Sequence, residues 1–209
     1  MHQPFVDIFI SASEAGIQGT FRGKRTYVAE GTGKIIGARF RPGAFHAIWK
    51  GKMSELQDAD IPLQQLFPDM QAQDFYDILA LPDHAERFAE LIRSLNPQPD
   101  PNIEIINKLI SAIEADDSNP SVADIAKELG RSERWIQAIF AEYMGVGLKW
   151  FLKRHMLLSA TERIRQTERP DWTAIAYDLG YSSQQHFITD FKSVVGLTPL
   201  QYKKHLNEL

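Results

Sequence analysis

Apolar residues recur at helical spacing through the second half of the chain. The first stripe, at intervals of three and four residues, consists of Ile103, Ile106, Leu109, Ile110 and Ile113. Ser121 with Asp124 is a capping pattern that opens a second helix, which Gly130 ends. Ser132 caps a third helix that reaches about Tyr143. This region is therefore predicted to be helical throughout.

The pattern then predicts one long helix and three shorter ones. The long helix covers about 147–168, and a proline shortly after it blocks its continuation. Asp171 caps the next helix, and Ser182 with Gln185 forms a capping box for the one after that. Thr198-Pro199, an N-cap with proline in the first turn, starts the last.

The first half has a different pattern. Short β-branched or aromatic runs, separated by glycine-containing turns, predict strands at Phe5 to Ile10, Gly19 to Phe21, Thr26 to Ala29 and Ile35 to Phe40. Arg41-Pro42-Gly43 ends the last of these. Apolar residues at helical spacing then predict helices over 44–50, 69–80 and 83–95. The first half is therefore α+β, with a small sheet.

Alternating prolines divide the chain. We expect an N-terminal domain over 1–96, a proline-rich linker over 97–101 and a C-terminal domain over 102–209. The fold class is α+β overall, with an all-α C-terminal domain. That domain contains two helix-turn-helix units, about 121–145 and 171–196, joined by the long helix.

An internal repeat is the basis of the helix-turn-helix assignment. The sequence Ile125-Ala126-Lys127-Glu128-Leu129-Gly130-Arg131-Ser132 recurs as Ile175-Ala176-Tyr177-Asp178-Leu179-Gly180-Tyr181-Ser182. In each copy the glycine allows a sharp turn between two helices. With one residue inserted after the second turn, the expected core pairs are Ile136 with Phe187, Phe140 with Phe191 and Gly145 with Gly196.

The outward residues of each second helix are candidates for base contacts, since such a helix enters the major groove with its N-terminal residues. Arginine can bind both acceptors of guanine, and glutamine both edge groups of adenine. The candidates are Arg134, Gln137 and Ala138 in the first unit, and Gln184, Gln185, His186 and Thr189 in the second.

The long helix provides a matching distance. About twenty residues at ~1.5 Å each span roughly 30 Å, and successive major grooves on one face of DNA lie about 34 Å apart. One rigid helix can therefore place two recognition helices in adjacent grooves. The expected phosphate contacts are Arg131, Lys149, Lys153, Arg154, Lys192, Lys203 and Lys204.

Charge and composition add limits. The net charge is −4, but residues 118–209 carry 12 Lys and Arg against 10 Asp and Glu, which is compatible with DNA binding. No cysteine is present, so disulfides, thiolate metal sites and cysteine nucleophiles are excluded. We expect a cytoplasmic protein, with no signal peptide and no membrane partner.

These residues carry a family resemblance. Over roughly 104–205 the chain resembles the DNA-binding domain of the AraC/XylS family of bacterial transcription regulators. The matching residues are the two repeats, Trp135-Ile136-Gln137 with Phe140, and Phe187-Ile188-Thr189-Asp190-Phe191-Lys192 through Gly196-Leu197-Thr198-Pro199 to Tyr202. The resemblance implies a transcription regulator that binds promoter DNA and has RNA polymerase as a further partner. We expect it to be an activator.

The first half resembles, more weakly, the end of a cupin-like β-rich sensor found in one branch of this family. The matching residues are Gly37-Ala38-Arg39-Phe40-Arg41-Pro42-Gly43 and Pro62-Leu63, and the domain is short at its start. The resemblance implies control by a small-molecule effector or by homodimerisation. A speculative apolar pocket consists of Phe5, Ile8, Ile36, Phe40 and Trp49, all of which also suit a core.

The chain departs from the family at two corresponding positions, Ala138 and Thr189, where members frequently carry arginine. Our hypothesis is that guanine reading shifts to Arg134, while Gln184 and Gln185 favour A·T-rich contacts. A second half-site read strongly through guanines would contradict it.

Two alternatives to a ligand-sensing regulator remain open. The nearer is a DNA-binding protein controlled by a protein partner. The remote one is a cupin-type metal enzyme, which needs clustered ligands, whereas His2, His46 and His84 are scattered. Repair of alkylated DNA would need an acceptor cysteine. We expect no enzyme activity, cofactor or metal, and we interpret Asp58-Ala59-Asp60 as a polar loop rather than a cation site.

Overall fold

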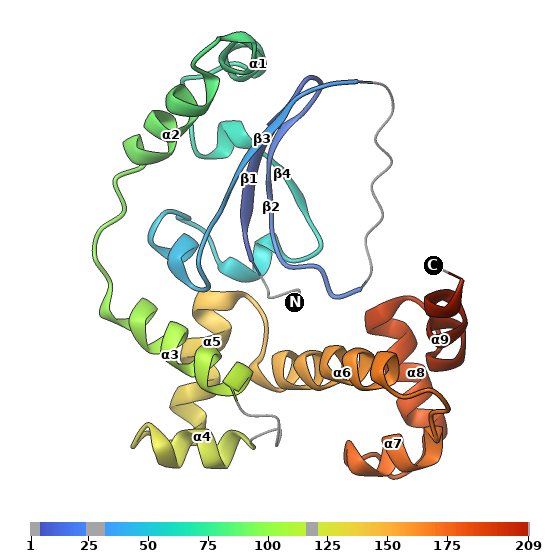
Figure 1. Cartoon of the computed structure of the whole chain (residues 1–209). Coiled ribbons are helices and arrows are strands. Elements are labelled where there is room, and N and C mark those ends of the chain that lie inside the picture. The colour runs from blue at the N-terminus through green and yellow to red at the C-terminus, as the bar shows by residue number, and fades with distance from the viewer. Residues whose placement is uncertain (1–4, 24–31, 116–120, 209) are drawn as a thin grey trace.

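The computed structural model describes residues 5–23, 32–115 and 121–208. The strand expected at 26–29 and the histidine at position 2 lie outside these residues. A small antiparallel sheet and a helical hairpin form the N-terminal part, and a long array of helices follows (Figure 1). The expected α+β class is confirmed.

The sheet consists of β1 (Asp7–Ser11), β2 (Ala15–Gln18), β3 (Ile35–Arg39) and β4 (Asp60–Pro62), in the order β3-β1-β2-β4. All neighbours pair antiparallel, with Ile8 opposite Ile17 on one side and Ala38 on the other. Alternate residues of β1 point into the core, so Ile8 and Ile10 are fully buried. This alternation is the period-two signal of a half-buried strand.

Two features of the sheet differ from the sequence prediction. The expected strand over 19–21 is wrong: the second strand is β2, and the chain leaves the sheet at Gly19. A Cβ at Gly19 would lie 2.1 Å from the Leu56 carbonyl oxygen, so this glycine marks a close backbone approach rather than a hairpin turn. The strand β4 was missed, because three residues ending in proline show no alternation.

The helices of the N-terminal part are shorter than expected. The helix predicted over 44–50 is a single 3₁₀ turn, η1 (Ala44–Ala47), preceded by Gly43 at φ 75°. Two more 3₁₀ turns follow, η2 (Met53–Leu56) and η3 (Leu63–Gln65). The hairpin consists of α1 (Ala72–Ala80) and α2 (His84–Ser94), close to the predicted helices.

The C-terminal helices follow the prediction closely. They are α3 (Pro101–Ala115), α4 (Val122–Glu128), α5 (Glu133–Met144), α6 (Leu148–Gln166), α7 (Trp172–Asp178), α8 (Gln184–Val195) and α9 (Pro199–Asn207). In Figure 1, α6 runs between two groups of helices, with α3, α4 and α5 at one end and α7, α8 and α9 at the other. No helix in the described part of the chain is long and apolar enough to cross a membrane.

Three apolar cores hold these parts together. The first lies between the sheet and α1–α2 and includes Ile8, Phe45 and Phe75. The second joins α3, α4, α5 and the start of α6 around Phe140. The third joins the end of α6 to α7 and α8 around Phe187 and Phe191, with Tyr202 of α9 packed against it. Each helix-turn-helix unit therefore has its own core.

The N-terminal part packs on the C-terminal end of α5. Gly145, in the left-handed region at φ 70°, lies so close to η2 that a Cβ there would be 2.4 Å from the Met53 carbonyl oxygen. The side-chain amide of Asn107 donates to the Pro42 carbonyl oxygen at 3.3 Å. The His46 ring stacks on Tyr143 with centroids 4.0 Å apart. No local sequence pattern indicates this contact surface.

Polar groups of the linker region anchor the same end of α5. The Tyr143 hydroxyl donates to the Asp100 carboxylate and accepts from the Asn102 amide, at 3.0 Å for the latter. Burial is the largest cause that raises the pKa of Tyr143, and the Asp100 carboxylate adds to it. The phenol is therefore neutral at physiological pH and donates its single proton to Asp100.

Candidate DNA-binding interface

The two helix-turn-helix turns have the same backbone geometry. Gly130 and Gly180 both adopt positive φ, at 59° and 79°. The next amide in each unit, Arg131 or Tyr181, donates to the carbonyl oxygen of the repeat alanine at 2.9 Å. These glycines occupy the left-handed position that ends a helix, and an L side chain there would be strained. The repeat read from the sequence is thus a repeat in structure.

The serines that cap the recognition helices confirm the one-residue insertion. Ser132 accepts from the Trp135 amide at the start of α5, at 3.2 Å. At the start of α8 the cap is Ser183, which accepts from the His186 amide at 3.3 Å. The expected capping box of Ser182 with Gln185 is therefore wrong. The inserted residue precedes the cap, so Ser183 corresponds to Ser132.

The inward residues are buried as the repeat predicts. Ile136, Phe140, Phe187 and Phe191 have no exposed surface. The repeat alanines, Ala126 and Ala176, are 4% and 0% exposed, where any larger side chain would push the helices apart. These duplicated residues form the frame that fixes α5 and α8, and they leave the opposite faces of both helices to solvent.

On α5 the candidate residues are open to solvent. Arg134 and Ala138 are exposed and Gln137 is half-buried. Within the described part of the chain, the structure gives the side chains of Arg134 and Gln137 no hydrogen bond or ion pair. The Arg131 guanidinium lies over the Trp135 ring, 5.1 Å from its centroid. Among the described residues, the first recognition helix therefore presents an unpaired guanidinium and an unpaired side-chain amide.

On α8 two of the candidates already have intramolecular partners. The Thr173 hydroxyl of α7 donates to the Gln184 side-chain oxygen at 2.9 Å. The Thr189 hydroxyl donates to the Gln185 carbonyl oxygen at 3.0 Å, one turn back in the same helix. The side chains of Gln185 and His186 are exposed. The two recognition helices therefore differ in how far their polar groups are already bonded.

The lysines among the candidate phosphate contacts fall into three groups. Lys149, Lys192 and Lys204 are exposed and have no ion pair within the described residues. Lys153 is paired with Asp190 of α8, with 2.6 Å between nitrogen and oxygen. Lys203 donates to the Arg165 carbonyl oxygen at 3.4 Å. The exposed lysines are the ones available to a phosphate without losing an intramolecular bond.

Arg154 is in a different environment from the other cationic candidates. Its guanidinium carbon lies 5.5 Å from the centre of the Trp150 ring, on the same face of α6. One terminal nitrogen, Nη1, is buried without a hydrogen-bond partner. Burial lowers the pKa of Arg154. A buried guanidinium nitrogen is expensive unless it is paired, so this residue has more to gain from an anion than the solvated lysines have.

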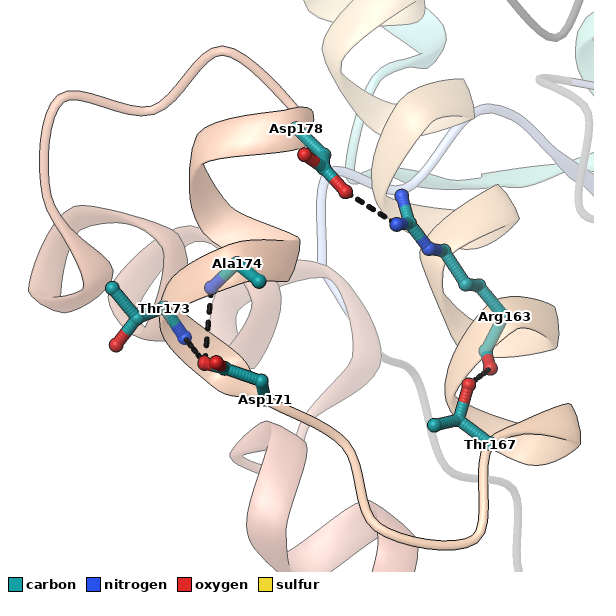
Figure 2. Close-up of polar contacts among 6 residues, drawn as sticks. All are labelled: Arg163, Thr167, Asp171, Thr173, Ala174 and Asp178. Atoms are coloured by element: carbon teal, nitrogen blue, oxygen red, sulfur yellow. Dashed lines mark hydrogen bonds and ion pairs between the residues drawn. The ribbon is translucent and has the colours of Figure 1, made fainter.

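Ion pairs fix the second unit on α6. Arg163 of α6 bonds Asp178 of α7, and the Thr167 hydroxyl donates to the Arg163 carbonyl oxygen at 2.9 Å (Figure 2). Asp171 caps α7 by accepting from the Thr173 and Ala174 amides at 2.9 and 3.0 Å. With the pair between Lys153 and Asp190, α6 is connected by charge to both helices of the unit.

Tyr181 adds to this contact between α6 and α8. Its ring packs edge-on against Phe187 with centroids 5.7 Å apart. Burial is the main cause that raises the pKa of Tyr181, and the Asp190 carboxylate adds to it. The residue after the second turn is thus part of the core, whereas its counterpart Arg131 is exposed.

The spacing of the two units is close to the expected value. The helix α6 has 19 residues, which at ~1.5 Å per residue span roughly 28 Å. Both recognition helices lie at its ends (Figure 1). Successive major grooves on one face of B-DNA lie about 34 Å apart. The few ångströms by which this spacing exceeds the length of α6 have to come from the offset of each recognition helix from the ends of α6.

The expected pocket residues lie in and around the N-terminal core. Ile8 is fully buried, while Ile36, Phe40 and Trp49 pack partly buried against the same cluster. The Arg39 guanidinium covers the Phe5 ring at 4.8 Å. A cavity of about 10 Å³, large enough for about one water molecule, lies at the boundary with α5, lined by residues that include Val6 and Tyr143.

The other candidates for ion binding have ordinary partners. The Asp58 carboxylate accepts from the Arg22 amide at 2.9 Å and forms an ion pair with its guanidinium at 3.6 Å. The His84 ring lies 2.9 Å from the Leu81 carbonyl oxygen. Within the described residues no group of three or more His, Cys, Asp or Glu could hold a metal ion.

Two family models and several known proteins are similar to parts of this chain. Residues 125–205 match a family model described as a helix-turn-helix domain, and residues 1–62 match a domain of unknown function (DUF6597). Regulatory protein SoxS of Escherichia coli K12 is 36% identical over 104 residues, which cover 49% of this chain and 96% of SoxS.

One further relative and one solved structure each match about half of the chain. YkgA of Escherichia coli K12, named as an HTH-type transcriptional regulator, is 34% identical over 101 residues, or 48% of this chain. The match spans only 42% of YkgA. A solved structure of a transcriptional regulator from Chromobacterium violaceum, with an AraC-type DNA-binding domain, is 25% identical with a TM-score of 0.42, covering 47% of this chain and 88% of that one.

Proposed function

Because the chain belongs to the AraC/XylS family of DNA-binding transcription regulators, we propose that it inserts α5 and α8 into two successive major grooves of one promoter. The observation that carries this proposal is that two helix-turn-helix units with the same turn geometry lie at the two ends of α6. Two separate helix-turn-helix proteins would need a symmetric dimer to bind two half-sites. Here one chain supplies both recognition helices and their spacing.

The base contacts of the two helices differ in chemistry. Arg134 reads guanine through its two acceptors, and Gln137 and Ala138 contact the neighbouring bases. Gln184, Gln185, His186 and Thr189 read the second half-site. This assignment is supported by the exposure of five of these residues, with Gln137 and Gln184 half-buried, beside caps that fix the start of each helix. Specificity therefore resides in the residues that the repeat does not duplicate.

Phosphate contacts position the chain on the duplex. We assign them to Arg131, Lys149, Lys153, Arg154, Lys192, Lys203 and Lys204, together with backbone amides of the recognition helices. Each neutralised phosphate releases counterions, so binding weakens as salt rises. The exposed lysines carry most of this effect, since they have no intramolecular partner to give up within the described residues.

The N-terminal part modulates DNA binding through the end of α5. It packs on Tyr143 and Gly145, so a change in that part is transmitted to the first recognition helix. A small-molecule effector and homodimerisation are the two sources of such a change. Control by a protein partner, with no ligand sensing, is the alternative, and the filled core around Ile8 favours it.

RNA polymerase is the further partner that a promoter-bound regulator of this kind requires. The protein works where the chromosome lies, which in a bacterial cell is the cytoplasm. The division into a modulating domain (1–96), a linker (97–101) and a DNA-binding domain (102–209) is part of this proposal. The separate cores of the two parts support it.

Binding measurements with DNA selected from a random library test the proposal. Replacing Gln184 and Gln185 by alanine is expected to weaken specific binding by about 1–3 kcal/mol per base pair that loses its contact. Binding to random DNA is expected to stay unchanged. Gln73→Ala, an exposed glutamine on α1, is the matched control. Unchanged discrimination between selected and random DNA in the double variant would refute the assignment.

A further inference from the structure

The two adjacent glutamines of α8 are in different surroundings. The Gln184 oxygen accepts from the Thr173 hydroxyl at 2.9 Å, across the turn between α7 and α8. The side chain of Gln185 is exposed, and within the described residues it has no hydrogen bond. Two residues of the same type, next to each other at the start of one recognition helix, therefore present different hydrogen-bonding groups.

Thr173 is free to make this bond because the cap of α7 does not use its hydroxyl. Asp171 accepts from the backbone amides of Thr173 and Ala174. In Figure 2 the Asp171 carboxylate is joined to the backbone nitrogens of Thr173 and Ala174, and no bond joins it to the Thr173 hydroxyl. A hydroxyl has one proton to donate, and here that proton goes to the Gln184 oxygen.

The bond fixes which end of the Gln184 amide faces outward. The amide is planar and its oxygen and nitrogen point in different directions, so an oxygen held by Thr173 leaves the amino group on the other side. Bidentate recognition of adenine needs both ends of the amide on one base edge. The bond to Thr173 uses one of the two acceptor positions of the Gln184 oxygen and turns that oxygen toward α7, so the two N–H donors are the groups of the amide left without a partner within the described residues.

On the basis of the proposed function, we propose that Thr173 is a specificity-determining residue, because it orients Gln184 to donate to a base edge that presents acceptors. Such edges are the O6 and N7 of guanine and the O4 of thymine, whereas adenine places an N6 donor beside its N7 acceptor. Gln185, with both ends of its amide available, is the residue that binds adenine. This assignment differs from the expectation that both glutamines favour A·T-rich contacts.

Thr173 is suited to a test because its side chain is exposed and its backbone is already capped. Valine keeps the β-branched shape and removes the hydroxyl, whereas serine keeps the hydroxyl. Thr161→Val is the matched control, since the Thr161 hydroxyl donates only within α6, to the Leu158 carbonyl oxygen at 2.6 Å. Thermal melting and circular dichroism of each full-length variant check that it is folded.

Base preferences of the full chain and its variants are measured by selection from a random DNA library. Gln184→Ala first identifies the position that Gln184 reads, as the one whose preference is lost. At that position the parent chain is expected to prefer guanine or thymine. Thr173→Val is expected to raise the share of adenine there by roughly three- to tenfold, the effect of one added hydrogen bond. Thr173→Ser and Thr161→Val are expected to keep the original preference.

The outcomes separate this inference from the proposed function. If Gln184→Ala relaxes no position, Gln184 makes no base contact and the proposed function loses that assignment. If Gln184→Ala relaxes one position but Thr173→Val leaves its preference unchanged, Thr173 does not determine specificity. An adenine preference at that position in the parent chain would also overturn the inference. In the background of Gln184→Ala, Thr173→Val is expected to have no further effect.

Discussion

The first helix-turn-helix unit lies between the N-terminal part and α6, whereas the second is held mainly by α6 and α9. In the first, the far end of the recognition helix is fixed by the approach of Gly145 to Met53 and the bond of Tyr143 to Asp100, and the side chains of Arg134 and Gln137 are unpaired within the described residues. In the second, Thr173 of α7 bonds Gln184 and Lys153 of α6 bonds Asp190, close to the candidate base-contacting side chains of α8. The two units share the same arrangement of core residues. Outside contacts stabilise the first recognition helix at its C-terminal end and the second beside its candidate base-contacting residues.

The difference suggests a division of roles. A contact at the far end of α5 can move the whole helix, so the first unit is the one that the N-terminal part can influence. Contacts beside the candidate base-contacting residues of α8 fix their orientation, so we expect the second unit to be the better preorganised for reading DNA. Preorganised side chains lose less entropy on binding.

The largest expected effect tests the independence of the two cores. Phe140→Ala and Phe187→Ala each empty a fully buried site, and each is expected to cost about 3–5 kcal/mol of unfolding free energy. Because the cores are separate, Phe187→Ala is expected to remove hydrogen-exchange protection from α7, α8 and α9 while α1 to α5 remain protected. Loss of protection throughout the chain in Phe187→Ala would show that the units are one cooperative body.

A smaller effect is expected at the glycines that end helices. An alanine in the left-handed region costs about 1–2 kcal/mol. Gly180→Ala is expected to cost that amount, since nothing lies within 4 Å of its Cβ position. Gly145→Ala adds a collision with the Met53 carbonyl oxygen. It is therefore expected to cost more, and to raise hydrogen exchange over η2.

Gly180→Ala serves as the control for this comparison, because it has the same backbone strain without the collision. Chemical denaturation gives the two free energies, and hydrogen exchange at residues 52–57 reports the contact between η2 and α5. Equal exchange there in the two variants would mean that Gly145 is not needed for the packing of the N-terminal part on α5.

The prediction from sequence was strongest where the signal is local. Gly130 and Gly180 could be recognised as turns because only residues next to them decide their conformation. The cap of α8 was misassigned because Ser182 and Ser183 are adjacent, and a one-residue insertion shifts the register between them. Turn chemistry identifies a helix start to within a residue or two, but not always the residue.

Contacts between distant segments could not be predicted. The approach of Gly145 to Met53 and the bond of Tyr143 to Asp100 join residues that no local pattern connects. The pair of Thr173 and Gln184 crosses a turn whose exact geometry decides whether the two side chains meet. The candidate base contacts were identified as a set, but the sequence could not show which of them already had a partner.

The smallest expected effect concerns phosphate contacts. Removing one free cationic contact is expected to reduce the slope of log binding constant against log salt by about 0.9. Lys149→Ala is expected to show this reduction. Lys153→Ala is expected to show less, because Lys153 is already neutralised by Asp190. Titrations at several salt concentrations measure both slopes, and equal reductions would mean that Lys153 leaves Asp190 when DNA binds.

The most direct test of the account is a footprint of the full chain on its selected DNA, combined with the base preferences of Arg134→Ala and Gln185→Ala. The account predicts two protected major-groove segments on one face of the duplex, about 10–10.5 base pairs apart. Arg134→Ala is expected to relax only one segment and Gln185→Ala only the other. A single protected segment, or both variants relaxing the same bases, would contradict the claim that one chain reads two grooves with differently equipped helices.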